Sequence, residues 1–236
     1  MALVGYGKMG KAIEEIALRR GHEIVCIIDL DNEKDFDSDA FRSADVAVEF
    51  TMPDAALNNY HKCFAQHIPV VAGTTGWIDH LPEIKEACEK DGQTFFYASN
   101  YSLGVNIFFA VNECLAGIMN NFPMYEVSME EVHHIHKLDS PGGTAITLAE
   151  GILKHIDRKK SWKESEKVSK DELMITSYRR GEEIGYHSVV YDSSVDTIQI
   201  SHNAKSRKGF ALGAVIAAEF LQGKKGFFGM KDMLKF

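Results

Sequence analysis

Residues 131–145 read EVHHIHKLDSPGGTA and gather proton donors and cations beside a glycine turn. Four of the five positions from 133 to 137 can carry positive charge, namely His133, His134, His136 and Lys137. Histidine titrates close to neutral pH, so it can donate a proton to a reacting group. The Pro-Gly-Gly-Thr turn precedes an apolar helical pattern, and N–H groups at the start of a helix bind anions. In a chain of formal net charge −8, this segment predicts a receptor for a small polyanion with acids that can protonate it.

The residues alone leave three interpretations of this histidine cluster open. The first is a metal site, but the chain has no HExxH motif or cysteine partner, and Lys137 would repel a cation. The second is a solvated or structural cluster. The third is a catalytic anion pocket, in which Gly142, Gly143 and Thr144 offer N–H groups and a hydroxyl to a carboxylate. The glycine turn favours the third interpretation, and we expect no metal.

A second motif lies at the start of the chain, where the apolar run Ala2–Val4 leads into GYGKMG at positions 5–10. Gly5 permits a tight turn, Gly7 lets the backbone approach a pyrophosphate, and Gly10 allows close packing of helix on strand. An acidic residue, Asp29, follows a predicted strand 19 positions after Gly10. This context predicts a nicotinamide dinucleotide site rather than a glycine-rich structural turn.

The predicted cofactor is NADH rather than NADPH. The Asp29 carboxylate can accept both hydroxyl protons of the adenosine ribose and would repel a 2′-phosphate, and the next residue, Leu30, offers no cation. Lys8 and Lys34 are possible phosphate partners, so NADPH stays open.

Three further loops follow predicted strands at the edge where open α/β sheets bind ligands. They are Phe50-Thr51-Met52-Pro53, Gly73-Thr74-Thr75-Gly76 and Ser99-Asn100-Tyr101-Ser102. Their small hydroxyl residues can contact ribose and nicotinamide, but they serve equally well in turns and helix caps. The spacing alone does not decide between these two roles.

The elements that must position these motifs follow two rhythms. In the first half, short apolar strands alternate with helices, which predicts a parallel sheet covered on both faces. We expect strands at 2–4, 23–28, 45–50, 69–72 and 94–98, helices at 11–20, 54–66 and 81–90, and a polar loop at 31–43.

In the second half, strands follow one another without helices between them, which predicts an open antiparallel or mixed sheet. We expect strands at 124–132, 172–178, 186–191 and 197–202, helices at 103–121, 144–156 and 210–221, and an exposed charged segment at 157–171. If the first of these strands ends near His134, strict alternation fails there and several of the charged groups can reach one pocket. The predicted fold class is α/β, with a Rossmann-type domain at 1–103 and 208–236 and a smaller α+β domain for substrate binding and oligomerisation at 104–207.

Composition excludes several other classes of protein. The apolar fraction of 45% and charged fraction of 25% are those of globular proteins. The chain has no apolar run of membrane-spanning length and no signal-peptide layout, and its acidic balance argues against a nucleic-acid partner. Four separated cysteines are most simply small core residues, so we expect a reduced, cytoplasmic protein.

The same motifs resemble the dihydrodipicolinate reductase family from end to end. The resemblance rests on GYGKMG at 5–10, EFTMP at 49–53, GTTGW at 73–77, SNYSLGVN at 99–106, EVHHIHKLDSPGGTA at 131–145 and SRKGFALGA at 206–214. It implies reduction of 4-hydroxy-2,3,4,5-tetrahydrodipicolinate to tetrahydrodipicolinate by NADH or NADPH in lysine and diaminopimelate synthesis. It also implies a homotetramer built through the sheets of the second domain.

The resemblance further implies residue roles. His133 would be the proton donor and acceptor and Lys137 the second proton donor, while His134 would bind one substrate carboxylate and Gly143 with Thr144 the other. The implied cofactor contacts are Gly5, Tyr6, Gly7, Lys8, Met9, Gly10, Asp29, Phe50, Thr51, Gly73, Thr74, Thr75, Ser99, Asn100, Tyr101 and Ser102.

The chain departs from the family pattern at three places. Gly142 stands where the family often has serine, the N-terminal glycine loop is short, and no arginine follows Asp29. The last two departures bear on cofactor preference, not on the reaction. Two alternatives are another amino-acid-pathway dehydrogenase, which would not need the HHIHK–PGGT string, and an NAD(H)-sensing protein without catalysis, against which His133 and Lys137 speak.

Overall fold

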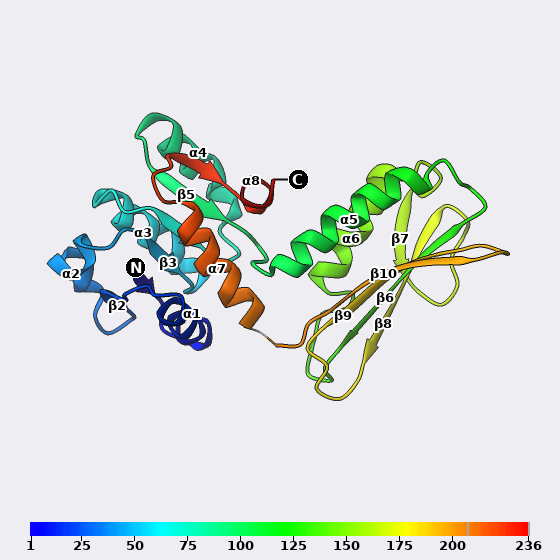
Figure 1. Cartoon of the computed structure of the whole chain (residues 1–236), viewed down its shortest axis with the longest axis horizontal. Helices are drawn as coiled ribbons and strands as arrows, with labels where there is room; N and C mark the ends of the chain where they lie inside the picture. Colours follow the sequence, from blue (N-terminus) through cyan, green and yellow to red (C-terminus); the bar gives the residue numbers. More distant parts are fainter. Residues whose placement is uncertain (207, 236) are drawn as a thin grey trace. The chain divides into compact units, whose positions relative to one another are not determined.

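The computed structural model describes residues 1–206 and 208–235, which form two compact units. The first unit combines residues 1–103 with the C-terminal segment that starts at Lys208, and the second begins at Gly104 (Figure 1). The predicted domain bounds at Arg207 and Phe236 lie outside the described residues. Within the described part of the chain, no helix combines the length and apolar character needed to cross a bilayer.

A six-stranded parallel sheet forms the centre of the first unit, in the order β11-β5-β4-β3-β1-β2. Its strands are β1 (Ala2–Val4), β2 (Cys26–Ile28), β3 (Ala47–Glu49), β4 (Val70–Ala72), β5 (Thr94–Tyr97) and β11 (Gly226–Phe228). The strands are short and apolar because both faces of the sheet are buried. The C-terminal edges of β1, β3, β4 and β5 carry the four loops that the sequence singles out.

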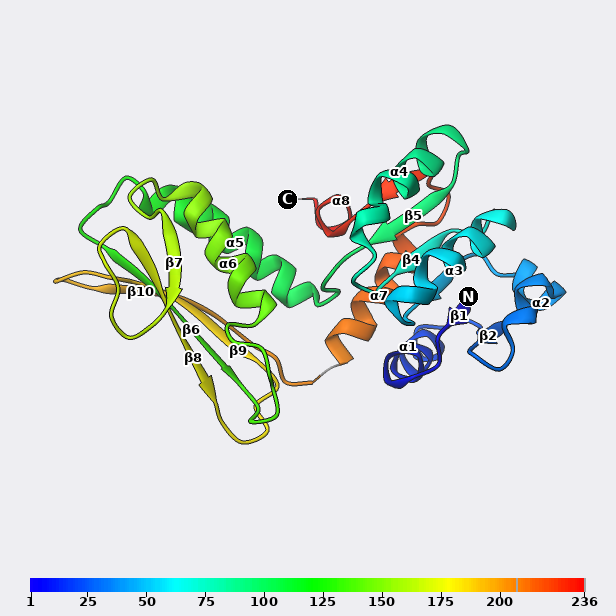
Figure 2. The same cartoon turned by 180° about the vertical axis from the view of Figure 1, so that it is seen from behind.

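Helices cover both faces of this sheet (Figures 1 and 2). Leu3, Val48 and Val71 share one core with α1 (Lys8–Arg19), α7 (Lys208–Phe220) and α8 (Met230–Leu234). The alternate residues of the same strands share a second core with α2 (Asp39–Arg42), α3 (Pro53–Ala65) and α4 (Leu81–Lys90), together with the 3₁₀ turn Glu33–Asp37. A further 3₁₀ turn, Ile78–His80, precedes α4.

The second unit is built on a five-stranded mixed sheet in the order β10-β9-β6-β8-β7. Its strands are β6 (Glu126–His133), β7 (Ser161–Glu164), β8 (Glu172–Arg179), β9 (Tyr186–Asp192) and β10 (Thr197–Asn203). The central strand β6 runs parallel to β8 and antiparallel to β9. Helices α5 (Leu103–Met119) and α6 (Gly143–His155) pack on one face, over Val127, Met129 and Ile175. On the other face, side chains such as Ser128, Glu130 and Thr176 are only half-buried.

The predicted fold class, a Rossmann-type parallel sheet with a second mixed-sheet unit, is confirmed. The predicted loop at 31–43 is wrong in part, because Phe36 and Phe41 are buried and fix a 3₁₀ turn and α2 there. The Ser38 side chain caps α2 by accepting a hydrogen bond from the Phe41 N–H at 3.1 Å. The segment 157–171 also differs from expectation, since it contains β7 and the buried Lys159, whose ammonium donates to two backbone carbonyls.

Candidate active site

The histidine-rich segment leaves the sheet at the end of β6. The strand ends at His133, so side-chain alternation stops there and the following residues form a turn. The Lys137 N–H donates to the His134 carbonyl at 3.2 Å within this turn. The turn continues to Gly142, the N-cap of α6.

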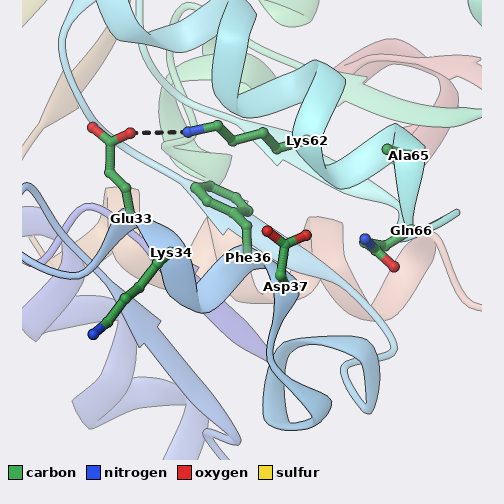
Figure 3. A pocket seen from close by; sticks show the side chains of 7 residues that line it. All are labelled: Glu33, Lys34, Phe36, Asp37, Lys62, Ala65 and Gln66. Atoms are coloured by element: carbon green, nitrogen blue, oxygen red, sulfur yellow. Dashed lines mark hydrogen bonds and ion pairs between the residues drawn. The ribbon is translucent and has the colours of Figure 1, made fainter.

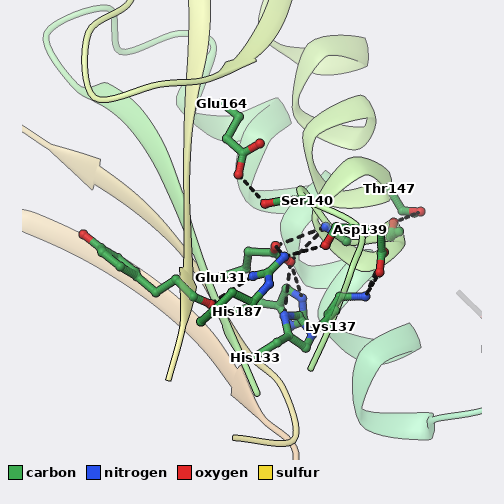
Figure 4. A network of polar contacts seen from close by, with 12 residues as sticks. Glu131, His133, Lys137, Asp139, Ser140, Thr147, Glu164 and His187 are labelled. Atoms are coloured by element: carbon green, nitrogen blue, oxygen red, sulfur yellow. Dashed lines mark hydrogen bonds and ion pairs between the residues drawn. The ribbon is translucent and has the colours of Figure 1, made fainter. Parts of the chain in front are cut away.

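A buried carboxylate, Glu131, stands at the centre of the polar cluster (Figure 4). Both of its oxygens accept the Gly142 N–H, each at 3.1 Å, and Oε1 also accepts from Arg179 at 3.2 Å. Two imidazoles face Oε2, with His133 Nδ1 at 3.4 Å and His187 Nε2 at 3.6 Å. One strand-borne carboxylate therefore faces a helix N-terminus, a guanidinium and two histidines.

This environment shifts two pKa values downward. Burial alone would raise the pKa of Glu131, but His187, the Gly142 N–H and His133 outweigh it and lower that pKa to about 2. Burial lowers the pKa of His133 to about 4, with His187, Lys137 and Arg179 acting in the same direction and Glu131 opposing them. At neutral pH Glu131 is therefore ionised and the His133 imidazole is neutral.

Lys137 and the start of α6 border the same cluster. The Lys137 ammonium pairs with both oxygens of Asp139, at 2.7 and 2.8 Å. A side-chain carbon at Gly142 would lie 2.9 Å from both Glu131 Oε2 and Lys137 Cε, whereas one at Gly143 would meet nothing within 4 Å. Lys137 would have to move to admit a serine at Gly142, while the neighbouring Gly143 borders open space.

The structure brings the predicted catalytic and substrate-binding residues together, whereas another histidine of the same segment lies apart. His133, Lys137 and Gly142 surround Glu131, with Gly143 and Thr144 directly after them at the start of α6. His134 lies beside them in the turn and has a buried Nδ1 atom without a hydrogen-bond partner. His136 turns instead to Glu182, 3.3 Å away, and is largely exposed.

The glycine motif forms a tight cradle between β1 and α1. Gly5 has φ +91°, and a side-chain carbon there would lie 2.2 Å from the Phe50 carbonyl oxygen. One at Gly10 would lie 2.3 Å from the Gly5 oxygen, which explains the close packing of helix on strand. Gly7, the N-cap of α1, borders open space, as a backbone that must approach a phosphate requires. Tyr6, Lys8 and Met9 complete this segment, and these features fit a dinucleotide.

Asp29 lies directly after β2, beside the glycine cradle. Its Oδ2 accepts the Tyr6 N–H at 3.3 Å, and its Oδ1 accepts the Leu30 N–H at 2.9 Å. The side chain is exposed and so remains accessible to a ligand. Lys34, the alternative phosphate partner, lines a separate pocket of about 340 Å³ together with Glu33, Phe36, Asp37, Lys62, Ala65 and Gln66 (Figure 3). None of the predicted cofactor residues lines that pocket.

A second buried carboxylate, Glu49, joins two of the predicted cofactor loops. Its Oε1 accepts hydrogen bonds from the Thr51 N–H at 3.1 Å, from the Thr74 hydroxyl at 2.9 Å and from the Thr51 hydroxyl. Tyr60 donates to Oε2 at 3.1 Å. Burial raises the pKa of Glu49, although these hydrogen bonds oppose that shift. Close packing also joins the loops, since a side chain at Gly73 would overlap the Phe50 ring. Thr75 is exposed at the tip.

The third loop, after β5, combines core and surface residues. Tyr101 is buried, and its hydroxyl donates to the Ala72 carbonyl at 2.7 Å, so only its backbone is left for a cofactor contact. Asn100 Oδ1 accepts the Ser102 N–H at 2.8 Å, which shapes the loop, and Ser99 is exposed.

Three residues could geometrically hold a metal ion, because ligand atoms of Glu131, His133 and His187 lie within 4.8 Å of one another. Arg179 on Glu131 and the adjacent Lys137 ammonium oppose a further cation at this place. A metal-free site therefore stays our prediction.

Sequence reasoning missed four polar residues of these sites, namely Glu49, Glu131, Arg179 and His187. Two of them could have been found from the sequence. Glu131 follows Val127 and Met129 at alternate positions of a strand and therefore points inward with them. Glu49 is the one charged residue in an otherwise apolar strand. A carboxylate at a core position has to be paired, and so marks a polar site. Arg179 and His187 reach the cluster through strand register, opposite His133 and Glu131 respectively.

Comparisons with known proteins agree along the whole chain. Residues 1–101 match the family model "Dihydrodipicolinate reductase, N-terminus", and residues 104–234 match "Dihydrodipicolinate reductase, C-terminus". A 4-hydroxy-tetrahydrodipicolinate reductase of Christiangramia forsetii is 50% identical over 99% of this chain and 97% of its own, and one of Staphylococcus saprophyticus is 33% identical over 98% of each. The fold matches dipicolinate-bound dihydrodipicolinate reductase from Paenisporosarcina sp. TG-14, with TM-score 0.79, 22% identity and coverage of 98% and 97%.

Proposed function

We propose that this chain, which belongs to the dihydrodipicolinate reductase family, is a 4-hydroxy-tetrahydrodipicolinate reductase of lysine and diaminopimelate synthesis. In the balanced reaction, 4-hydroxy-2,3,4,5-tetrahydrodipicolinate, one NAD(P)H and one proton yield tetrahydrodipicolinate, NAD(P)⁺ and water. Beyond the family match, the observation that supports this activity is the buried Glu131–His133 pair beside Lys137 and the start of α6. It provides acids and anion-binding N–H groups where a cyclic dicarboxylate needs both.

His133 and Lys137 are the proposed catalytic residues. The bound nicotinamide supplies a hydride, which leaves a carbon with excess electron density in the ring that must gain a proton. A dianionic substrate raises the proton affinity of the neutral His133 imidazole beside it, so His133 can take up a proton and pass it on. Lys137 is the second proton donor, and its pairing with Asp139 holds the ammonium close to Gly142.

The two substrate carboxylates are assigned to His134 and to the start of α6. The free backbone N–H groups of Gly143 and Thr144, with the Thr144 hydroxyl, bind one carboxylate in the partial positive charge of the helix N-terminus. His134 binds the other through its ring.

The first unit is the proposed cofactor domain. The Gly5–Gly10 cradle and the N-terminus of α1 hold the pyrophosphate, while the loops at Phe50–Thr51, Gly73–Thr75 and Ser99–Ser102 contact the nicotinamide half. Asp29 binds the adenosine ribose hydroxyls, so NADH is preferred over NADPH. Asp29→Ala should weaken NADH about tenfold, the loss of a hydrogen-bonded charge, and NADPH much less. Fluorescence titration of both cofactors measures this, and equal losses would remove the ribose contact.

The proposed assembly is a homotetramer formed through the half-buried face of the second sheet, where Ser128, Glu130 and Thr176 point. Analytical ultracentrifugation tests the tetramer. All four cysteines are free thiols, in keeping with the reducing cytoplasm where we place the enzyme.

The decisive assay follows NADH oxidation with freshly generated 4-hydroxy-tetrahydrodipicolinate. Pyridine-2,6-dicarboxylate, a planar analogue, should inhibit and should bind more tightly when NADH is present. NADH oxidation that pyridine-2,6-dicarboxylate does not inhibit would favour another dehydrogenase. If NADH binds but does not change the affinity for pyridine-2,6-dicarboxylate, a sensor would be favoured.

A further inference from the structure

Glu131 contacts both functional parts of the substrate site. Its carboxylate accepts the Gly142 N–H where α6 begins, and it faces Nδ1 of His133 at 3.4 Å. Gly142 directly precedes the Gly143–Thr144 pair assigned to a substrate carboxylate, and His133 is the assigned proton donor. One buried side chain therefore lies between the group that would hold the substrate and the group that would protonate it.

The position of Glu131 is set by the sheet and not by a loop. It lies within β6, two residues before His133, and its strand partners are Ser177 on β8 and His187 on β9. His133 itself lies opposite Arg179, which donates to Glu131 Oε1. Functional groups held by regular strands keep their geometry better than groups on loops.

The two nitrogens of His133 have different surroundings. Nδ1 is buried and faces the Glu131 carboxylate, whereas Nε2 points towards Gly185, where a side-chain carbon would lie only 3.1 Å away. A carboxylate opposite Nδ1 favours the tautomer with the proton on Nδ1, which leaves Nε2 as the reactive nitrogen. A side chain at Gly185 would crowd that nitrogen.

We propose that Glu131 is a positioning residue that fixes the His133 tautomer and the first turn of α6 relative to each other. The expected changes in kinetics rest on the proposed function. The effects on the His133 tautomer and on the Gly142 hydrogen bond can be measured in the free enzyme. The charge is essential to this role, because a neutral amide in the same place can accept the Gly142 N–H but cannot balance Arg179 and attract the Nδ1 proton equally well.

The test compares Glu131→Gln with Glu150→Gln, a matched change at an exposed glutamate on α6 of the same unit. In Glu131→Gln we expect kcat/KM to fall about 10²-fold, the cost of misplacing a reacting group, with a lower kcat, a higher KM and an NADH Kd within about twofold of wild type. The kcat–pH profile should also shift relative to wild type. Glu150→Gln should stay within about twofold of wild type in each quantity. Glu131→Asp keeps the charge and should recover part of the loss.

Two measurements on free enzyme separate this proposal from the proposed function. Nitrogen-15 NMR of the imidazoles should report Nδ1–H on His133 in wild type and a mixture of tautomers in Glu131→Gln. Hydrogen exchange at the Gly142 amide should be at least about tenfold faster in that variant, because its hydrogen bond to charge is weakened. If wild type lacks reductase activity but these differences appear, the positioning role stands and the function fails. A folded Glu131→Gln with wild-type tautomer, exchange and pH profile would overturn the proposal, as would equal losses in the Asp and Gln variants.

Discussion

Glu49 and Glu131 are the same residue type, and both are fully buried on central strands. Their environments nevertheless shift their pKa values in opposite directions. Glu49 lies among neutral donors, the hydroxyls of Thr51, Thr74 and Tyr60, and burial raises its pKa. Glu131 faces Arg179, two imidazoles and a helix N-terminus, and its pKa falls to about 2. Burial alone therefore does not decide the charge of a carboxylate. Cations and oriented N–H groups keep Glu131 charged in the second unit, whereas the hydroxyl donors around Glu49 in the first unit do not offset the effect of its burial.

The largest expected effect comes from removing the two proposed proton donors beside Glu131. Lys137→Ala and His133→Gln should each lower kcat by about 10²- to 10⁴-fold, the usual range for a lost general acid, while the NADH Kd stays nearly unchanged. Steady-state kinetics and fluorescence titration measure both quantities. Wild-type turnover in either variant would show that the substituted residue is not a proton donor. The groups around Glu131 would then serve the structure alone.

A second prediction sets the two carboxylates against each other in a stability–pH profile. The folded pKa of Glu131 is below its unfolded value, so its contribution is present above pH 4.5 and is lost as pH falls towards 2. This lowering of the Glu131 pKa corresponds to about 3 kcal/mol, as an order of magnitude. The folded pKa of Glu49 is raised, so its contribution is present below pH 4.5 and is lost as pH rises through the folded value.

Urea unfolding of wild type, Glu49→Gln and Glu131→Gln between pH 3 and 7 tests this sign difference. Because the folded pKa of His133 is lowered, this residue also destabilises the fold as pH falls from 6.5 towards 4. The same comparison in a His133→Gln background removes this contribution to the free energy of unfolding. Relative to wild type, Glu131→Gln should lose most stability at neutral pH and least at pH 3. Glu49→Gln should show the reverse slope, and parallel profiles for both variants would refute the contrast.

A third prediction concerns protons taken up with the ligand. His133 is neutral at pH 7 because burial lowers its pKa to about 4. A dianion beside it should raise that pKa, so binding of pyridine-2,6-dicarboxylate should take up as much as about one proton per site. Calorimetry in buffers of different ionisation enthalpy gives this number, and His133→Gln should abolish most of it. Uptake that persists in the variant would assign the proton to another group.

The contrast between the two carboxylates also shows which features can be predicted from the sequence and which cannot. The alternating strands, the glycine cradle and the HHIHK–PGGT string are local patterns, so the fold class and the position of the histidine turn could be predicted. The partners of Glu131 could not, because Arg179 and His187 come from strands 48 and 56 residues further along and meet it only through register. Tyr101 is a predicted cofactor contact, but its side chain lies in the core, where the ring packs beside Phe96 and the hydroxyl donates to the Ala72 carbonyl. Local spacing does not reveal which loop residue a sheet will bury.

The smallest expected effect is on cofactor binding by Glu49→Gln. An amide oxygen can accept from Thr51 and Thr74 as the carboxyl does, and the Tyr60 hydroxyl can accept from the amide nitrogen instead of donating. Because every donor and acceptor keeps a partner, the NADH Kd should change by less than about threefold. Glu49→Ala is the informative companion, since it removes the shared acceptor of the Thr51, Thr74 and Tyr60 hydroxyls and should weaken NADH clearly more. A Glu49→Gln loss as large as that of Glu131→Gln in kcat/KM would mean that Glu49 acts through its charge, and the distinction between the two units would fail.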